Sequence, residues 1–206
     1  MKLWLGAVPV GAGLAVALAA LTAVAEDTVP SRLQGQISEV NGQSLSVKTS
    51  DGKTTQVTLT PDAHIFNMVK TKSDAIGTDT LIGAVGPQTP DERIKAETVV
   101  IFPKDLQGAG AGYFSQDTKK GTAMRQGSVQ EVTSEKDGRV VKIYSPQAGA
   151  TILIPPDAKV MTLEPGDQKL LTKGAHVIVP AAKRQDDGSY TADALAVGEQ
   201  GAVPPG

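Results

Sequence analysis

Hydrophobic residues recur at every second position in several short segments of the chain after its first 30 residues. This period of two is typical of β-strands that bury one face and expose the other. No segment after residue 25 sustains the 3.6-residue period of an amphipathic helix over several turns. The pattern therefore predicts an all-β protein. The alternating pairs are Leu45 and Val47, Val57 and Leu59, Val141 and Ile143, Ile152 and Ile154, and Val177 and Val179.

Four dipeptides that end in Gly separate these segments and predict the turns between strands. Asn, Asp and Gly tolerate the positive φ angles of tight hairpin turns, so each dipeptide favours a β-hairpin. Two further segments, 73–76 and 168–171, are expected to form short helical turns before the next strand. The hairpin signals are Asn41-Gly42, Asp51-Gly52, Asp137-Gly138 and Asp187-Gly188.

Residues 1–25 have the organisation of a secretory signal peptide. Lys2 precedes an uncharged segment that ends in Ala23-Val24-Ala25, the small-x-small pattern that signal peptidase recognises. We therefore expect cleavage after Ala25 and a periplasmic or secreted protein. The alternative is an uncleaved membrane anchor, because the apolar segment approaches the roughly 20 residues that span a bilayer. No second apolar segment of this length follows, so no membrane span is expected in the mature chain.

The mature chain contains an internal repeat. Four blocks of similar sequence recur in the same order at offsets of 92, 95, 94 and 96 residues, which favours a duplication over chance similarity. Each copy of the repeat should therefore adopt the same fold. The matched blocks are Gly35–Val40 with Gly127–Val132, Val57–Ile65 with Ile152–Val160, Ala84-Val85 with Ile178-Val179, and Ala96–Ile101 with Ala192–Val197.

The repeat predicts two small β-domains that follow one another along the chain. Five or six short strands in about 70 residues are too few for an immunoglobulin-type sandwich and suit a small closed or partly closed barrel. We expect the first OB-like β-barrel at residues 32–103 and the second at 125–198. The Gly-rich segment 104–124 is expected to be a linker, and residues 199–206 a disordered tail.

The order of these motifs resembles an uncharacterised OB-like domain that is common in exported bacterial proteins. The tandem form is similar to a family of two-copy exported proteins from alphaproteobacteria, whose members often carry the label "metal ABC transporter permease". Relatives tend to have His and Trp after the Gly-rich linker, where this chain has Tyr113-Phe114-Ser115-Gln116. The resemblance implies tandem OB-like barrels and names no chemistry. The segments that carry it are Val99–Pro103, the linker, Pro165-Gly166-Asp167 and Gly174–Ala182.

Composition and charge narrow the functions that are compatible with this fold. Lys plus Arg number 20 and Asp plus Glu 22, and this near balance argues against binding of nucleic acid through bulk charge. Aromatic residues make up only 3% of the chain, too few for a base-stacking surface. The chain has no Cys, which excludes disulfides, thiolate metal ligands and Cys nucleophiles. We therefore expect no nucleic acid partner and no cofactor.

The chain offers little material for a metal or catalytic site. Its two histidines, His64 and His176, are not repeated between the copies, and a transition-metal site needs three or four convergent ligands. The Asp-Gly dipeptides lack the spacing of a calcium loop. No common hydrolase or phosphate-binding motif occurs, so no enzyme is expected. Repeated carboxylates should lie one per barrel, where they cannot form an acid–base pair; these are Glu39 with Glu131 and Asp62 with Asp157.

Tyr113 and Phe114 form a bulky pair in a Gly/Ala-rich segment and are weak candidates for contact with a partner protein. They could insert into an apolar groove of that partner or pack on the chain's own barrel. The sequence predicts a non-enzymatic binding or scaffold protein of the cell envelope, with an envelope protein as its partner. The alternative is a periplasmic metal-handling accessory protein, and a third hypothesis is a hydrolase that uses Ser or Asp.

Overall fold

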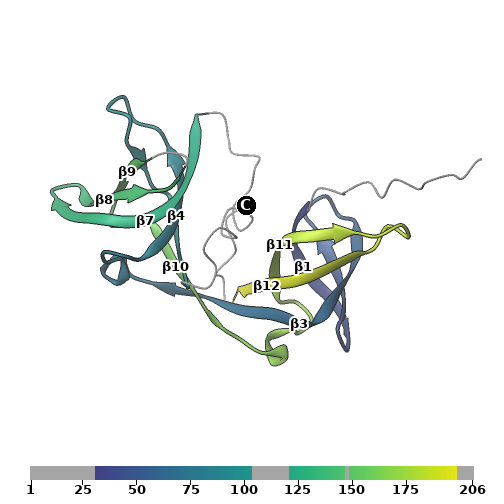
Figure 1. Cartoon of the computed structure of the whole chain (residues 1–206). Helices are drawn as coiled ribbons and strands as arrows, with labels where there is room; N and C mark the ends of the chain where they lie inside the picture. Colours follow the sequence, from purple (N-terminus) through teal and green to yellow (C-terminus); the bar gives the residue numbers. More distant parts are fainter. Residues whose placement is uncertain (1–30, 104–120, 147–148, 199–206) are drawn as a thin grey trace, which may run out of the picture.

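The computed structural model describes residues 31–103, 121–146 and 149–198, which form an all-β structure (Figure 1). The expected signal peptide, the tail and most of the expected linker lie outside these residues. In the described part of the chain, no helix is long and apolar enough to cross a membrane. The strands are β1 (Ser31–Asn41), β2 (Ser44–Thr49), β3 (Thr54–Thr71), β4 (Leu81–Pro87), β5 (Ile94–Lys95), β6 (Thr98–Phe102), β7 (Thr122–Glu135), β8 (Gly138–Tyr144), β9 (Ala150–Ile154), β10 (Lys159–Pro165), β11 (His176–Arg184) and β12 (Tyr190–Gly198).

Five strands close into a barrel, and they come from both ends of the described chain. β1, β2 and β3 form an antiparallel meander, β11 pairs with β1, and β12 pairs with both β11 and β3. Purple N-terminal strands and yellow C-terminal strands therefore lie side by side in one lobe (Figure 1). Its interior is filled by hydrophobic side chains of both segments, such as Leu45 and Val47 with Val177 and Leu195. We call this lobe the closed barrel.

The remaining strands form the second lobe. β4 lies between β6 and β7, β8 pairs with β7 and β9, and β5 pairs with β9. Its interior combines Ile82 and Val99 from the first copy of the repeat with Val141 and Ile152 from the second. β3 and β10 pair with each other as antiparallel strands and connect the two lobes (Figure 1).

The two copies of the repeat exchange strands. Of the twelve strand pairings among the described residues, six join one copy to the other. The expected assignment of one barrel to 32–103 and one to 125–198 differs from these pairings, because each range supplies strands to both lobes. β3 and β10 cause this exchange. Each runs from the lobe that contains the preceding strands of its copy to the other lobe, where the following strands of that copy lie. Alternation in the sequence reports which face of a strand is buried and does not identify its neighbour.

Equivalent backbone contacts recur in the two lobes. The N–H of Gly174 donates to the carbonyl of Ile37 at 2.7 Å, and the N–H of Asp79 donates to the carbonyl of Val129 at 2.9 Å. Gly174 and Asp79 both have positive φ, at 91° and 62°. Because Val129 is the counterpart of Ile37 in the repeat, the duplication extends to single hydrogen bonds and to an uncommon backbone conformation.

The strand register corrects one block of the sequence alignment. Leu33 lies opposite Val179, and its counterpart Arg125 lies opposite Ala84. Ala84 therefore corresponds to Val179, one residue later than the expected match with Ile178. In this register Ala84 and Val179 both point into a lobe interior, whereas Ile178 points out of the closed barrel.

The turns agree with the sequence. All four predicted hairpins are confirmed, since the strands on either side of each dipeptide are antiparallel neighbours. The glycine of each dipeptide has positive φ. The two predicted helical turns are confirmed as short 3-10 helices, η1 (Ser73–Ala75) and η4 (Gln168–Leu170).

Gly35 and Gly127 open the repeated motif and permit close packing of the first two strands in each copy. A Cβ atom on Gly35 would overlap the backbone carbonyl of Lys48, and one on Gly127 would overlap that of Tyr144. A register shift follows each glycine, between Ile37 and Glu39 in β1 and at the same place in β7. The glycines therefore let each strand bend sharply as the lobe curls.

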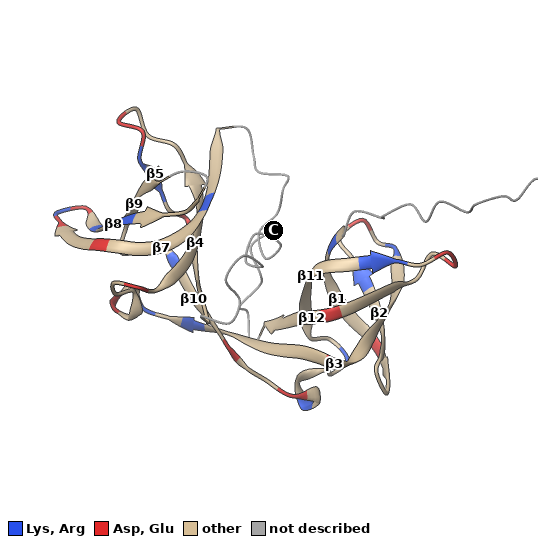
Figure 2. Cartoon of the chain, in the orientation of Figure 1, with Lys and Arg blue, Asp and Glu red and all other residues tan. Residues whose placement is uncertain are grey.

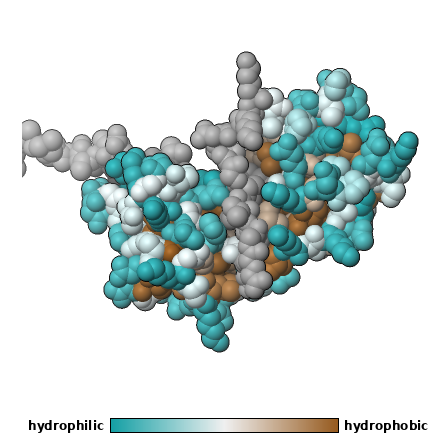
Figure 3. All heavy atoms as spheres, turned by 180° about the vertical axis from the view of Figure 1, so that it is seen from behind, coloured by the Kyte–Doolittle hydropathy of each residue, from teal (hydrophilic) through white to brown (hydrophobic). Residues whose placement is uncertain are grey.

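A third hydrophobic cluster, the central cluster, lies between the lobes. In β6, Val99 and Ile101 point into the second lobe, whereas Val100 and Phe102 belong to the central cluster. Runs such as Val99–Phe102 are hydrophobic at every position because both faces of the strand are covered. Hydrophobic surface is seen near the middle of the molecule, and the outer ends of the lobes are mostly hydrophilic (Figure 3). Charged residues of both signs are interspersed over both lobes (Figure 2).

Candidate functional site

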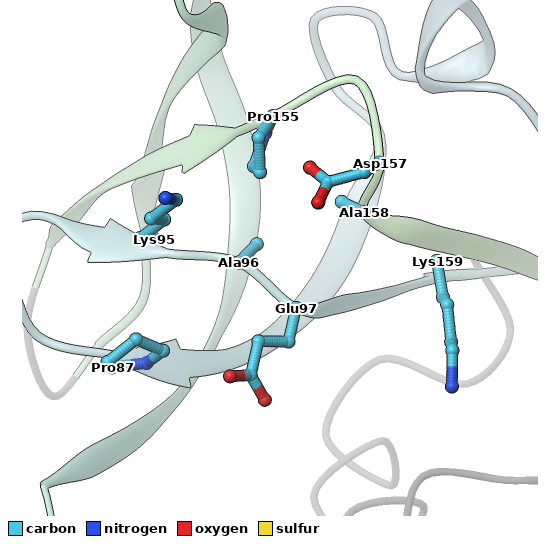
Figure 4. A pocket seen from close by; sticks show the side chains of 8 residues that line it. All are labelled: Pro87, Lys95, Ala96, Glu97, Pro155, Asp157, Ala158 and Lys159. Carbon is cyan, nitrogen blue, oxygen red and sulfur yellow. The ribbon is translucent and has the colours of Figure 1, made fainter.

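The second lobe carries a surface hollow beside the turn between β9 and β10 (Figure 4). Its volume is about 290 Å³, at the lower end of the range for ligand sites. The end of β4, the segment that joins β5 to β6 and the start of β10 surround it. The lining residues are Pro87, Lys95, Ala96, Glu97, Pro155, Asp157, Ala158 and Lys159.

The four charged side chains of the hollow are all exposed. The carboxylate of Asp157 points toward its middle, whereas the carboxylate of Glu97 and the ammonium of Lys159 point away from it (Figure 4). An acid–base pair or an ion site needs charged groups that converge on one point. The arrangement therefore supplies neither, and the hollow suits at most a small polar molecule.

The corresponding place in the closed barrel has related side chains. Asp62 and His64 of β3 stand where the second lobe has Asp157 and Lys159. As expected from the sequence, the two aspartates lie in different lobes. The carboxylate recurs at an exposed position in both copies, which agrees with a role in local structure.

The other repeated carboxylates also lie on exposed strand surfaces, one in each lobe. Glu131 of β7 accepts a hydrogen bond from the ammonium of Lys142 on β8 at 2.8 Å. Its counterpart Glu39 lies on β1 opposite Ser46 of β2. An exposed cross-strand ion pair contributes at most about 1 kcal/mol, so Glu131 has a modest structural role.

The two histidines do not come together. His64 is exposed on β3 and its ring stacks on Phe66 with centroids 6.3 Å apart. His176 opens β11, is exposed and lies opposite Gln36. Within residues 31–103, 121–146 and 149–198, no group of three His, Asp or Glu side chains could hold a metal ion.

The outer face of β1, β2 and β3 in the closed barrel carries a polar network. Gln56 donates from its amide nitrogen to the hydroxyl of Ser46 at 2.8 Å, and the Ser38 hydroxyl donates to the Ser46 carbonyl at 3.1 Å. Ser46 is only 8% exposed, although it lies on the side of β2 opposite the interior. The face therefore offers uncharged hydrogen-bonding groups that are already partly engaged with one another.

The equivalent face of the second lobe differs by one exposed aromatic ring. Tyr144 ends β8 and is 62% exposed. Lys48 stands at the corresponding place of the closed barrel, because Gln36 lies opposite Lys48 as Ser128 lies opposite Tyr144. An exposed Tyr combines a large apolar area with a hydroxyl and is enriched where proteins bind one another.

The other described aromatic side chains have structural positions. Phe66 and Phe102 are buried in the central cluster, and Tyr190 packs against the interior of the closed barrel. Among the described residues, Tyr144 is thus the one Phe, Tyr or Trp that is exposed. Tyr113 and Phe114, the partner-binding candidates of the sequence, lie outside the described residues.

Two hairpin turns owe their carboxylate pKa shifts to local hydrogen bonds. The pKa of Asp51 falls to about 2, mainly because the Thr49 hydroxyl donates to its carboxylate, and Lys53 adds further hydrogen bonds. The pKa of Asp187 is lowered by hydrogen bonds from the hydroxyl and backbone N–H of Ser189. Both aspartates hold turns, as the sequence predicts.

Sequence reasoning missed Arg139, which links the copies at a 3-10 turn. Its guanidinium donates to the carbonyls of Ser73 and Ile76, each at 2.9 Å. The corresponding residue of the first copy is Gln43. Arg139 lies beside a strong turn signal and carries no pattern of its own, so only the three-dimensional neighbourhood of η1 identifies its role.

Comparison with family models, with curated proteins and with solved structures gave no match.

Proposed function

We propose that the protein is an exported, non-enzymatic binding or scaffold protein of the cell envelope, built from two OB-like barrels. The signal-like segment at residues 1–25 supports export. The observation that carries the binding role is Tyr144, a large aromatic side chain held 62% exposed at the end of a strand. A rigid sheet that presents such a ring suits contact with another protein.

The partner-binding surface is proposed to be the outer face of β7 and β8, with Tyr144 at its centre. Lys142 and Glu131 lie next to it as a cross-strand ion pair and would form the polar rim. The equivalent face of the closed barrel has Lys48 in place of the ring, so the two faces should not bind alike. An envelope protein is the proposed partner, contacted by one lobe only.

Capture from a periplasmic extract tests this proposal, with the mature protein as bait. Tyr144→Ala should lower the amount of captured partner at least about tenfold, because exposed aromatic anchors dominate protein interfaces. Val40→Ala is the matched control, since Val40 is 37% exposed on the closed barrel and should leave capture unchanged. The same difference in captured amount between the parent and Tyr144→Ala should be measured with the purified partner. Equal capture by the parent and both variants would reject the proposed surface.

The Tyr113 and Phe114 pair gives a second arm of the same experiment. Replacing both with Ala should lower capture if they contact the partner directly. A loss of stability without loss of capture would assign the pair to packing on the chain itself. If neither property changes, both roles are excluded.

The alternative proposal is a periplasmic metal-handling accessory protein, which rests on the resemblance to the exported family. A titration of the mature protein with Zn²⁺, Cu²⁺, Ni²⁺ and Mn²⁺ tests it. Binding tighter than roughly 10 μM that is lost in His64→Ala or His176→Ala would favour this alternative. Weaker binding to every metal would remove it.

A further inference from the structure

The contact between β3 and β10 has the symmetry of a dimer interface. Met68 of β3 lies opposite Leu163 of β10, and these two residues occupy equivalent places in the repeat. On either side, Phe66 lies opposite Pro165 and Lys70 opposite Met161. The pairing is therefore centred on a pseudo-two-fold axis between Met68 and Leu163, as in an isologous interface between identical subunits. We call this strand pair the seam.

The backbone of the seam is symmetric, but the side chains around it are not. Phe102 of the first copy, in the central cluster, corresponds to Gly198 of the second. Likewise Ile178 of the second copy, in the same cluster, corresponds to Gly83 of the first. Large residues of one copy thus correspond to small residues of the other.

We call residues 31–102 the first half of the chain and residues 122–198 the second half. The correspondence of large with small residues specifies which halves can pair. Two first halves would bring two Phe102 rings to a central cluster that holds one, and two second halves would bring none. Overpacking and cavities each cost stability, so the pairing of a first half with a second half is favoured. The seam therefore selects unlike halves.

We propose that two copies of this chain associate by exchanging halves through the seam, so that a second copy of the chain is its partner. Nothing in the selected contacts requires that the two halves belong to one chain. In the exchanged dimer, the first half of each chain completes both lobes with the second half of the other. Every strand pairing is kept, and exchange of identical elements is a low-cost route to dimers.

The connection between the halves decides which form is populated. The connection within one chain gives its two halves an effective concentration in the millimolar range. The monomer is therefore favoured at micromolar protein, and the exchanged dimer forms when chains refold at high concentration or when the connection is too short.

The strand register sets the minimum length of the connection. β4 lies between β6 and β7, with Leu81 opposite Phe102 and Pro87 opposite Thr122. A connection within one chain must therefore cross the length of β4, roughly 20 Å at about 3.3 Å per residue, and two strand spacings of about 4.8 Å each. About seven extended residues are needed to cover this span. Residues 103–121 exceed this length, whereas about four residues do not reach.

Two shortened chains test the proposal. A chain with about four residues between Phe102 and Thr122 should be a dimer by light scattering, and a chain with about twelve should stay monomeric. Both should keep the parent's circular dichroism spectrum. The proposal is contradicted if the chain with the four-residue connection is a folded monomer, or if it fails to fold while the chain with the twelve-residue connection folds.

A disulfide across the seam distinguishes exchanged halves from any other dimer. The chain has no Cys, and opposite residues of an antiparallel pair lie within the range for a disulfide. Met68→Cys combined with Leu163→Cys should form a disulfide within one chain when the connection has twelve residues. The same pair should form a disulfide between two chains when the connection has four residues. Met68→Cys alone should give no cross-link in either form. A cross-linked dimer of that single variant would show that like halves meet and would reject the proposal.

The parent chain provides an independent check without shortening. After unfolding in urea, refolding at about 1 mM should yield a dimer fraction, and refolding at about 5 μM should yield monomer. The proposal would be overturned if no dimer forms at the high concentration and the chain with the four-residue connection is also monomeric.

Discussion

The closed barrel and the second lobe share a backbone plan and differ at the surface. Both have a glycine within the bent first strand, a 3-10 turn, and a pair of backbone hydrogen bonds that fixes the following strand. The second lobe alone has an arginine on its 3-10 turn and an exposed Tyr144. The shared features are those that the fold requires, and the differences are the positions at which the two lobes can act differently.

The β7–β8 hairpin is the clearest difference. In the closed barrel the β1–β2 hairpin ends with Asn41 opposite Ser44, whereas β7 and β8 continue to the pairing of Glu135 with Gly138. The extra length brings Glu135 within 3.0 Å of Arg93, near β5. The second lobe thus has an additional surface ion pair at the turn of this hairpin, at the opposite end of β8 from Tyr144.

Gly35→Ala and Gly127→Ala make the same change in the two lobes and should have the largest effect. Each added methyl group would overlap a backbone carbonyl, which lowers the free energy of unfolding by about 2–3 kcal/mol. Because both lobes contain strands of both copies, urea unfolding should be a single transition that either variant shifts to lower urea.

Gly77→Ala is the control for this pair. Gly77 has open space around its Cα, with Thr80 Oγ1 at 4.0 Å from a Cβ atom, so the change should have little effect. Two transitions in the parent, only one of which moves in each variant, would contradict interlocked lobes and favour independent barrels.

Arg139→Gln converts the second lobe to the residue of the closed barrel and should have an intermediate effect. The variant loses two hydrogen bonds from a charged donor to the carbonyls of η1. Because the Arg139 side chain is 24% exposed, we expect a loss of about 1.5 kcal/mol in the free energy of unfolding, measured in urea. Lys142→Gln, which breaks an exposed ion pair, should change it by less than about 1 kcal/mol. Equal losses in the two variants would show that Arg139 acts only through surface charge.

The sequence predicted the local structure well because local structure depends on neighbouring residues. Period-two alternation identified the strands, and the Asp-Gly and Asn-Gly dipeptides identified all four hairpins. The repeated Gly35 motif also has a physical basis, since only glycine fits against Lys48. Internal similarity then supplied the correspondence between the copies, apart from the one-residue shift at Ala84.

The exchange of strands between copies could not be predicted from these patterns. Val177 fills the closed barrel as well as its counterpart Ile82 fills the second lobe, and a barrel made from a single copy would bury either residue. The two copies differ at counterparts such as Gly83 and Ile178, which are distant in sequence and which no local pattern relates. The exposed position of Tyr144 is equally non-local, because Tyr is intermediate in its preference for burial and the residue type alone does not decide its position.

A change in the turn between β2 and β3 should have the smallest effect on stability. This turn also contributes a dependence of stability on pH that its counterpart in the second lobe lacks. Hydrogen bonds from Thr49 and Lys53 lower the pKa of Asp51 to about 2, below its ordinary value of 3.8. A lowered pKa means that the stabilisation is present above pH 3.8 and is lost as the pH falls through about 2. The connection between β8 and β9, residues 145–149, has no carboxylate, so the dependence from this particular turn belongs to the closed barrel. In the second lobe, a hydrogen bond with the Thr89 side chain lowers the pKa of Asp91 in another turn.

Thr49→Val removes the largest cause of the Asp51 shift and keeps the size of the side chain. The pKa of Asp51 should rise toward 3.8, as followed by NMR titration of its carboxyl carbon. The pKa of Asp187, which Ser189 lowers, should stay where it is and serves as the internal control. Because Asp51 is exposed, the overall stability near neutral pH should hardly change. If Asp51 titrates near 3.8 already in the parent chain, the Thr49 hydroxyl does not hold this carboxylate in solution, and the two lobes should then respond alike to acid.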